Sequence, residues 1–314
     1  MIITVTLNPA LDKSVVIEDF GPNKGNRISE MRLDAGGKGI NVSKMVHTLG
    51  GDTLALGVLG GTIGAYIINS LNKMQIPNDF VHVLSETRTN LKIYDPVRQE
   101  YTDINEPGFV LPAVRLTEIE TKLFYYAKKG DYVVFAGGAP GGVPAGAVAD
   151  WTRRLNALGA RVVADLDGEL LRHETSARPF LIKPNLAEFQ RLCKLTDTSL
   201  PSLEASARKL IARGVRNVVV SLGPQGALFI NSKQTLFAKA PQQKAKSTVG
   251  AGDAMTAALV YALNRNQSWR DAITLSMATA TAKVTGEGNT PPPVEKINAF
   301  KSKIEIKELT PQEA

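Results

Sequence analysis

Short apolar runs alternate with helical patterns along most of this sequence, and this alternation restricts the fold more than any other feature. An apolar run opens the chain at residues 2–7, and residues 40–49 follow with a helical pattern that ends at Gly50-Gly51. Later apolar runs, each separated from the next by helical stretches, lie at residues 54–59, 132–136, 162–165, 180–183 and 218–222. Strands separated by helices form parallel sheets that helices cover on both faces. The sequence therefore predicts an α/β fold with a Rossmann-like, doubly wound and mostly parallel sheet.

Two stretches interrupt this alternation. Residues 14–33 hold strand-like pieces with no helix between them, and residues 90–94 and 101–105 indicate a hairpin around Pro96. Both stretches alternate apolar with polar residues, which is typical of an antiparallel sheet with one exposed face. We interpret residues 1–314 as a single domain, from which insertions at about 12–35 and 88–106 project as a small β-sheet lid.

The composition indicates a globular protein that binds small anions. With 314 residues, of which 43% are apolar, the chain can bury a sizeable core. Its formal net charge of +7 suits nucleotides and sugar phosphates. Nucleic acid would also suit this charge, but no dense tract of Lys and Arg with interleaved aromatic residues occurs. We therefore expect small-molecule ligands and no nucleic-acid partner.

The sequence also bears on location. Cys193 is the single cysteine, so no disulfide can form within the chain, and a reducing compartment fits. No apolar run approaches the roughly 18 residues that a membrane span needs. The first residues lack the basic segment of a signal peptide. We expect a cytoplasmic protein with no membrane partner.

Residue types that bind ligands gather where the predicted strands end. Residues 137–140, 165–168, 183–185 and 221–223 follow four of the strands and combine Gly with Asp, Lys, Asn and Ser. Ligands of doubly wound sheets bind beyond the carboxyl ends of the strands. Glycine lets the backbone approach a ligand, and the other residues supply donors or carboxylates. We therefore expect the active site at this edge of the sheet.

The most informative segment is Ser247-Thr248-Val249-Gly250-Ala251-Gly252-Asp253, followed by the almost wholly apolar run 254–263. The run predicts a buried helix, and the small residues before it allow a tight turn with N–H groups pointing out of the helix start. Such a site would stabilise a phosphoryl group during transfer. Asp253 would either accept the proton of an attacking hydroxyl or cap the helix. The Gly-Ala-Gly turn favours the catalytic role.

A second glycine-rich segment, Gly36-Gly37-Lys38-Gly39-Ile40-Asn41, also opens a helix. Its glycines would let a sugar approach the backbone, Asn41 could bind hydroxyl groups, and Lys38 could meet a phosphate. By itself such a helix start is weak evidence. No Walker A, protein-kinase or zinc-protease pattern occurs, and residues 57–64 are better interpreted as a strand-to-helix turn than as a dinucleotide site.

Taken together, the two signatures at 36–41 and 247–253 resemble the PfkB/ribokinase family of carbohydrate kinases. Further matches are similar to the branch of this family that acts on phosphosugars, with 1-phosphofructokinases, tagatose-6-phosphate kinases and minor 6-phosphofructokinases as its members. These matches lie at residues 6–12, 87–90, 183–185 with Glu188, and 221–227. The resemblance implies a ribokinase-like fold, ATP and Mg²⁺ as cofactors, and phosphorylation of fructose 1-phosphate to fructose 1,6-bisphosphate. Tagatose 6-phosphate and fructose 6-phosphate remain alternative substrates.

The resemblance also implies a role for each matching residue. Asp253 would be the base, and the amides of Gly250, Ala251 and Gly252 would form the anion hole. The sugar phosphate would be bound by Asp12, Arg27, Gly36, Gly37, Lys38, Asn41, Arg88 and Asn90. The nucleotide would lie near Lys183, Asn185, Ser221, Gly223, Gly226, Thr248, Gly250 and Gly252. Asn185 and Glu188 would hold Mg²⁺ through water or phosphate, and the lid would pair two subunits into a homodimer.

The sequence departs from the family pattern at two places. Ser247 stands where many relatives have Asp, and residues 137–140 read Gly-Gly-Ala-Pro in place of the usual Gly-Ser-Leu-Pro. The second departure leaves the sugar open, because a serine hydroxyl is lost. The sequence also disfavours two other classes of protein. A catalytically silent sensor of sugar phosphates is disfavoured by the intact Gly-Ala-Gly-Asp, and a nicotinamide oxidoreductase by the lack of a Gly-x-Gly-x-x-Gly turn after the first strand.

Overall fold

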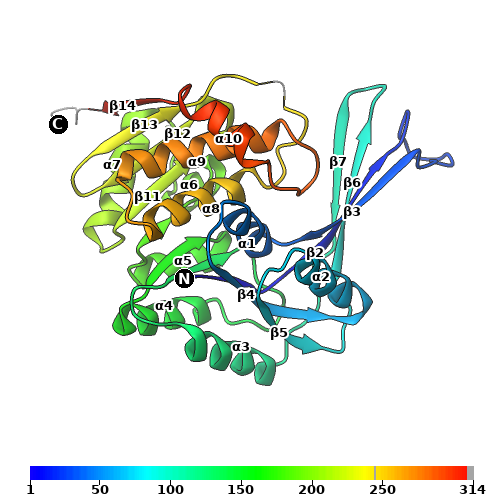
Figure 1. The fold of residues 1–314 in the computed structure, drawn as a ribbon, viewed down its shortest axis with the longest axis horizontal. Coiled ribbons are helices and arrows are strands. Elements are labelled where there is room, and N and C mark those ends of the chain that lie inside the picture. The colour runs from blue at the N-terminus through cyan, green and yellow to red at the C-terminus, as the bar shows by residue number, and fades with distance from the viewer. Residues whose placement is uncertain (244, 310–314) are drawn as a thin grey trace.

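The computed structural model describes residues 1–243 and 245–309, and a ten-stranded sheet forms its centre (Figure 1). The strand order is β14-β13-β12-β11-β10-β9-β8-β1-β4-β5. The parallel strands are β1 (Ile2–Thr6), β4 (Thr53–Gly60), β5 (Asn78–Val83), β8 (Tyr132–Ala136), β9 (Arg161–Asp165), β10 (Leu181–Ile182) and β11 (Asn217–Ser221). An antiparallel edge follows, made of β12 (Ala227–Asn231), β13 (Thr235–Lys239) and β14 (Glu305–Leu309). The predicted mostly parallel α/β fold is confirmed.

Helices cover both faces of this sheet, because successive side chains of each strand point to opposite sides. In β8, Val133 and Phe135 pack with α3 (Ala113–Tyr126), α4 (Ala147–Leu158), α5 (Gly168–Ser176), α6 (Leu186–Cys193) and α7 (Leu200–Ala212). Tyr132, Val134 and Ala136 pack on the other side with α1 (Lys38–Thr48), α8 (Ala251–Asn264), α9 (Trp269–Val284) and α10 (Val294–Lys301). A third cluster includes α2 (Gly61–Lys73). The sheet therefore contributes to two apolar cores, and both ends of its strands are held rigidly.

A separate four-stranded sheet projects from one side of this body (Figure 1). Its order is β3-β2-β6-β7, with bounds β2 (Ala10–Val16), β3 (Glu30–Gly36), β6 (Arg88–Asp95) and β7 (Glu100–Asn105). The strands β2 and β6 run parallel, and the two outer pairs are antiparallel. Two segments that are distant in the chain thus form one sheet, as their alternation of apolar and polar residues predicts.

The register of the small sheet gives it two different faces. Residues that lie directly opposite each other on neighbouring strands point to the same face of the sheet. Asp12 is opposite Asp34 and Asn90, and Ser14 is opposite Arg32 and Lys92, so one face is polar.

The other face of this sheet is apolar. Val15 is opposite Met31 and Ile93, and Leu91 is opposite Ile104. Met31 is 57% exposed and Ile104 51%, so part of this apolar face is open to solvent.

Within residues 1–243 and 245–309, no helix combines the length and the apolar character that a membrane crossing requires.

Candidate active site

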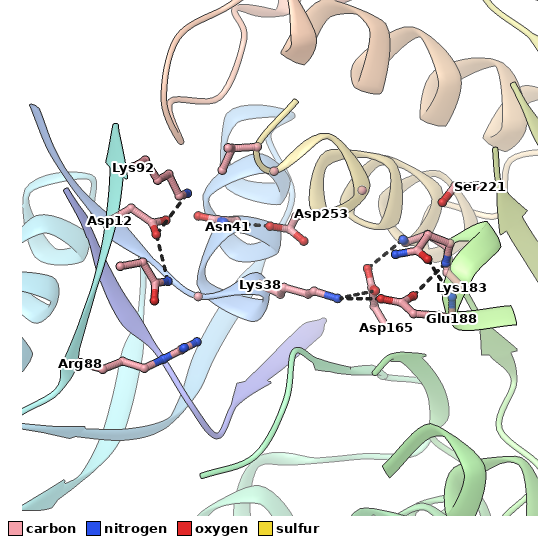
Figure 2. A pocket seen from close by; sticks show the side chains of 16 residues that line it. Asp12, Lys38, Asn41, Arg88, Lys92, Asp165, Lys183, Glu188, Ser221 and Asp253 are labelled. Atoms are coloured by element: carbon pink, nitrogen blue, oxygen red, sulfur yellow. Dashed lines mark hydrogen bonds and ion pairs between the residues drawn. The ribbon is translucent and has the colours of Figure 1, made fainter. Parts of the chain in front are cut away.

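A cavity of about 390 Å³ lies between the small sheet and the carboxyl ends of the parallel strands (Figure 2). It is lined by Asp12, Gly37, Lys38, Asn41, Arg88, Asn90, Lys92, Asp165, Lys183, Asn185, Glu188, Ser221, Val249, Gly250, Gly252 and Asp253. Lys38 and Asn41 come from the first turn of α1, and Asp253 from the first turn of α8. In Figure 2, Asp12 and Arg88 lie at one end, Lys183 and Glu188 at the other, and Asn41 with Asp253 between them. Both glycine-rich segments therefore meet in one cavity.

The turn before α8 has the geometry that its glycines allow. Gly250 is the N-cap residue and has a φ of 73°, a left-handed conformation that glycine adopts without strain. No side chain caps this helix start. The N–H of Ala251 donates to the carbonyl of Thr248 at 3.3 Å, and Ala251 does not line the cavity. The remaining N–H groups in the first turn of α8 have no partners within the helix. An anion bound at this helix start would therefore contact Gly252 first.

Asp253 is buried at the centre of the cavity, with 7% of its surface exposed. It does not cap α8. Its Oδ2 instead accepts a hydrogen bond of 2.8 Å from Nδ2 of Asn41 on α1. Burial, followed by the negative charge of Asp165, raises the pKa of Asp253 to about 6. A carboxylate with this pKa is ionised at neutral pH and is a stronger base than an ordinary Asp.

Asp165, at the carboxyl end of β9, organises the cations of the site. Its Oδ2 lies 3.0 Å from Nζ of Lys183, and its Oδ1 lies 3.4 Å from Nζ of Lys38. The hydroxyl of Thr256 also donates to it at 2.9 Å. Burial alone would raise the pKa of Asp165, but the two ammonium groups outweigh it and lower the pKa to about 2. Glu188 lies at the same end, so two ammonium groups face two carboxylates there, and both ammonium groups line the cavity where they can contact phosphate oxygens.

Asn185 and Glu188 open α6 as a capping box. The N–H of Glu188 donates to Oδ1 of Asn185 at 2.9 Å, and the N–H of Asn185 donates to Oε2 of Glu188 at 2.8 Å. Oε1 of Glu188 lies 3.9 Å from Nζ of Lys38. The two residues are held rigidly and face the cavity.

The described residues contain no group of three or more His, Cys, Asp or Glu side chains that could hold a metal ion by themselves. Mg²⁺ usually binds nucleotide phosphates, water and only one or two carboxylates. Glu188 and Asn185 fit Mg²⁺ binding of this kind, in which nucleotide phosphates and water supply the other ligands.

Asp12 occupies the opposite end of the cavity and is surrounded by donors. Its Oδ1 accepts from Nδ2 of Asn90 at 3.2 Å and lies 3.2 Å from Nζ of Lys92, while its Oδ2 accepts from Nδ2 of Asn289. A Cβ on Gly36 would lie 2.5 Å from Oδ2 of Asp12, so only glycine leaves room for this carboxylate.

Arg88 lines the same end of the cavity. Its guanidinium donates to the carbonyls of Glu106 at 2.9 Å and of Asn8 at 3.2 Å, and its buried Nε has no partner.

Several residues expected at the site do not line the cavity. Arg27 is exposed in the hairpin between β2 and β3, and Gly36, Thr248, Ala251, Gly223 and Gly226 do not line the cavity. Gly223 and Gly226 flank a short 3₁₀ turn that follows the cavity residue Ser221. Arg27 belongs to a loop whose position no local sequence pattern determines.

Three cavity residues had no expected role of their own: Lys92, Asp165 and Val249. A signal for Lys92 existed, because strand alternation places it on the same face as Asn90. Asp165 ends β9, at the sheet edge where the sequence predicts the active site.

A second cavity, of about 510 Å³, lies beside the first and shares Arg88 with it. Its two carboxylates are already engaged. Glu86 accepts from the N–H groups of Thr62 and Ile63, and Glu106 accepts from the N–H of Thr89. It contains no helix start with open amides, so the first cavity is the better candidate for the chemistry.

Comparisons with known proteins find similar chains over nearly the full length. The family model described as pfkB family carbohydrate kinase matches residues 6–297. A 1-phosphofructokinase from Xanthomonas campestris is 39% identical over 267 residues, which cover 83% of this chain and 83% of that protein. A 1-phosphofructokinase from Rhodobacter capsulatus is 33% identical over 311 residues, covering 99% and 98%. The solved structure of the phosphofructokinase-2 from Escherichia coli in complex with substrates and products is similar with a TM-score of 0.92 and 28% identity, covering 96% and 98%.

Proposed function

This chain belongs to the pfkB family of carbohydrate kinases, and on that premise we propose that it transfers the γ-phosphoryl group of ATP to fructose 1-phosphate. The acceptor would be the 6-hydroxyl group, and the products would be fructose 1,6-bisphosphate and ADP. The observation that carries the proposal is the position of Asp253. This buried carboxylate has a pKa of about 6 and lies between the end of the cavity that holds Lys183 and Glu188 and the end that holds Asp12 and Arg88.

In the proposed reaction, Asp253 accepts the proton of the 6-hydroxyl as the oxygen attacks the γ-phosphorus. Its raised pKa makes the carboxylate basic enough for this transfer while it remains ionised at neutral pH. Asn41 holds it through the hydrogen bond to Oδ2. The start of α8, with the amide of Gly252 foremost, stabilises the charge that spreads over the transferring phosphoryl oxygens.

The sugar phosphate would bind at the Asp12 end. Asp12 accepts hydrogen bonds from sugar hydroxyls, and Lys92, Arg88 and Asn90 supply donors for hydroxyl and phosphate oxygens. A carboxylate surrounded by cationic and amide donors selects a polyol that also carries negative charge. This arrangement supports a phosphosugar over a neutral sugar.

ATP would bind at the opposite end, with its phosphates near Lys183 and Lys38 and its nucleoside toward Ser221 and the Gly223–Gln225 turn. Mg²⁺ would be held by the phosphates together with Asn185 and Glu188, directly or through water, and it would neutralise charge on the triphosphate. ATP as donor and a single free cysteine fit a cytoplasmic location.

We also propose that residues 1–314 act as one kinase domain in which the small sheet serves as a lid and pairs two subunits. The polar face of the lid carries Asp12, Asn90 and Lys92 into the cavity, so its closure would exclude water from the reaction. The opposite apolar face, with Met31, Leu33 and Ile104 exposed, supports association with a second copy. Light scattering of the parent protein and of the Leu33→Asp variant measures the number of associated subunits directly. A dimer in the parent protein should become a monomer, and a monomeric parent protein would refute the pairing.

The substrate is tested by coupled ADP-release kinetics on fructose 1-phosphate, tagatose 6-phosphate and fructose 6-phosphate. We expect the largest kcat/KM for fructose 1-phosphate. A larger value for either of the other two would correct the sugar and leave the reaction type intact. Absence of ADP release with every phosphosugar would refute the kinase activity and favour a binding role.

A further inference from the structure

A buried lysine that the mechanism above does not use lies behind the Gly250 turn. Lys283 is the penultimate residue of α9 and is only 3% exposed. Its Cε lies 3.4 Å from the position that a Cβ on Gly250 would occupy. The side chain therefore passes directly behind the turn that opens α8. Its ammonium donates a hydrogen bond to the carbonyl of Gly288.

The end of α9 at Val284 and the segment that follows it, residues 285–290, join several parts of the site. The N–H groups of Lys246 and Ser247, which precede the Gly250 turn, donate to the carbonyl of Val284 at 2.8 and 3.3 Å. Asn289 donates through its side chain to Asp12 and through its backbone N–H to Asp34 at 3.2 Å. Lys283 thus bonds to a segment that also contacts the carboxylate at the sugar end and the small sheet.

Among residues 1–243 and 245–309, the close polar partner of the Lys283 ammonium is the neutral carbonyl of Gly288, and no ion pair cancels its charge. The charged groups that act on it are Asp253 on α8, Asp34 and Arg32 on β3, and Lys92 on β6. The two acids act on it more strongly than the two cations, and below its pKa the ammonium places a positive charge behind the turn. Burial lowers the pKa of Lys283 to about 8, although the acids oppose this change. An ammonium is costly to bury without a carboxylate partner, and such groups cluster at functional sites.

We propose that Lys283 is a positioning residue for phosphoryl transfer, whose ammonium holds the Gly250 turn against residues 285–290 and strengthens the positive field at the start of α8. This inference rests on the proposed kinase reaction. A phosphoryl group in transfer spreads negative charge toward that helix start, and a fixed positive charge in a water-poor site stabilises it more than the same charge in water does. The residue acts through the turn and does not touch either substrate.

The test compares Lys283→Met and Lys283→Arg with the parent protein, and it uses Lys296→Met as a control. Lys296 holds the same segment from α10 by donating to the carbonyl of Thr285 at 3.4 Å. Initial rates are measured on the phosphosugar that the parent protein turns over fastest, with both substrates varied. We expect Lys283→Met to lower kcat about 10-fold or more, a smaller loss than removal of a direct oxyanion donor causes. Both KM values should stay within about twofold, because the charge acts mainly on the transition state.

The pH profile gives a readout that a purely structural role would not change. In the parent protein, kcat should fall as the pH rises through about 8, because Lys283 then loses its proton. Lys283→Met should lack this alkaline fall, Lys283→Arg should keep its activity above that pH because a guanidinium stays charged, and Lys296→Met should match the parent.

Thermal melting at neutral pH separates function from folding. Lys283→Met should melt close to the parent protein, because loss of the hydrogen bond to Gly288 is offset by removal of a charge that is held against burial. A kcat within about twofold of the parent, or an alkaline fall that persists in Lys283→Met, would overturn the inference. So would equal losses of stability and kcat in Lys283→Met and Lys296→Met. If Lys283→Met does not fold, Lys283→Arg provides the test. The inference is then overturned if kcat of Lys283→Arg falls at alkaline pH in the same way as kcat of the parent protein.

These outcomes separate the two proposals. If the parent protein turns over no phosphosugar, both the proposed kinase activity and the inference about Lys283 are refuted. If the parent protein is active and Lys283→Met turns over the phosphosugar equally fast, only the inference about Lys283 is refuted.

Discussion

Replacement of Asp253 by Asn should separate catalysis from stability, because the two effects have opposite signs. Asn keeps the size of the side chain and can still accept the hydrogen bond that Asn41 donates at 2.8 Å. It cannot accept a proton. Turnover should therefore fall by roughly 10²–10⁴-fold, the usual contribution of a general base. This loss corresponds to about 2.7–5.4 kcal/mol of transition-state stabilisation.

The free energy of unfolding should change in the other direction. The pKa of Asp253 rises from 3.8 to about 6 on folding, so the unfolded chain releases this proton at lower pH than the folded protein does. Stability therefore falls as the pH rises from about 4 to about 6, and above that pH the ionised carboxylate costs up to about 3 kcal/mol. Asp253→Asn removes this cost. The variant should be more stable than the parent protein at neutral pH, and the difference should vanish near pH 4.

Coupled ADP-release kinetics and denaturant unfolding at several pH values measure the two quantities on the same samples. In the parent protein, kcat should also fall below a pH of about 6, as Asp253 becomes protonated. Near-normal turnover of the Asn variant would refute the base assignment. An unfolding free energy below that of the parent at neutral pH would refute the argument that burial of Asp253 is costly.

Two further substitutions test the sugar end of the cavity. Lys92→Met removes the ammonium that lies 3.2 Å from Oδ1 of Asp12, and should lower kcat/KM for the phosphosugar by roughly 10–100-fold while KM for ATP stays unchanged. Lys73→Met, on the exposed surface of α2, is its control, and an equal effect of both would indicate a general loss of positive field. Gly36→Ala places a Cβ 2.5 Å from Oδ2 of Asp12 and should raise KM for the sugar about 10-fold or more by displacing that carboxylate. Gly146→Ala, whose Cβ would meet no atom within 4 Å, should leave the KM unchanged, and an unchanged KM in Gly36→Ala would mean that Asp12 does not bind the sugar.

The parts of the site that sequence predicts are those built from neighbouring residues. Asn185 and Glu188 are three residues apart, and this spacing is that of the capping box that the structure contains. The glycines at 250 and 252 precede an apolar run, and the structure has a turn and a buried helix there. The small sheet followed from alternation within two short stretches. In each case, a local pattern limits the backbone to few conformations.

Asn289 and Lys283 show where such patterns end. Nothing near Asn289 in the sequence indicates that it donates to Asp12, because the two residues are 277 positions apart in the chain. Lys283 lies within a helix whose pattern predicts only packing, and its role depends on the distant Gly250 turn. Arg27 is the converse case, since an arginine suited to phosphate lies on an exposed loop outside the cavity.

The sequence by itself determined most of the parallel strands and their alternation with helices, the edge of the sheet that borders the cavity, and the turn that begins α8. These features depend on periodicity and on glycine, which act over a few residues. Only the tertiary structure decided the chemistry of Asp253. Its partner Asn41 is 212 residues away in the chain, and its pKa is set by burial and by the charge of Asp165. A carboxylate becomes a base of suitable strength through the solvent it loses and the charges brought close to it, and folding alone arranges both.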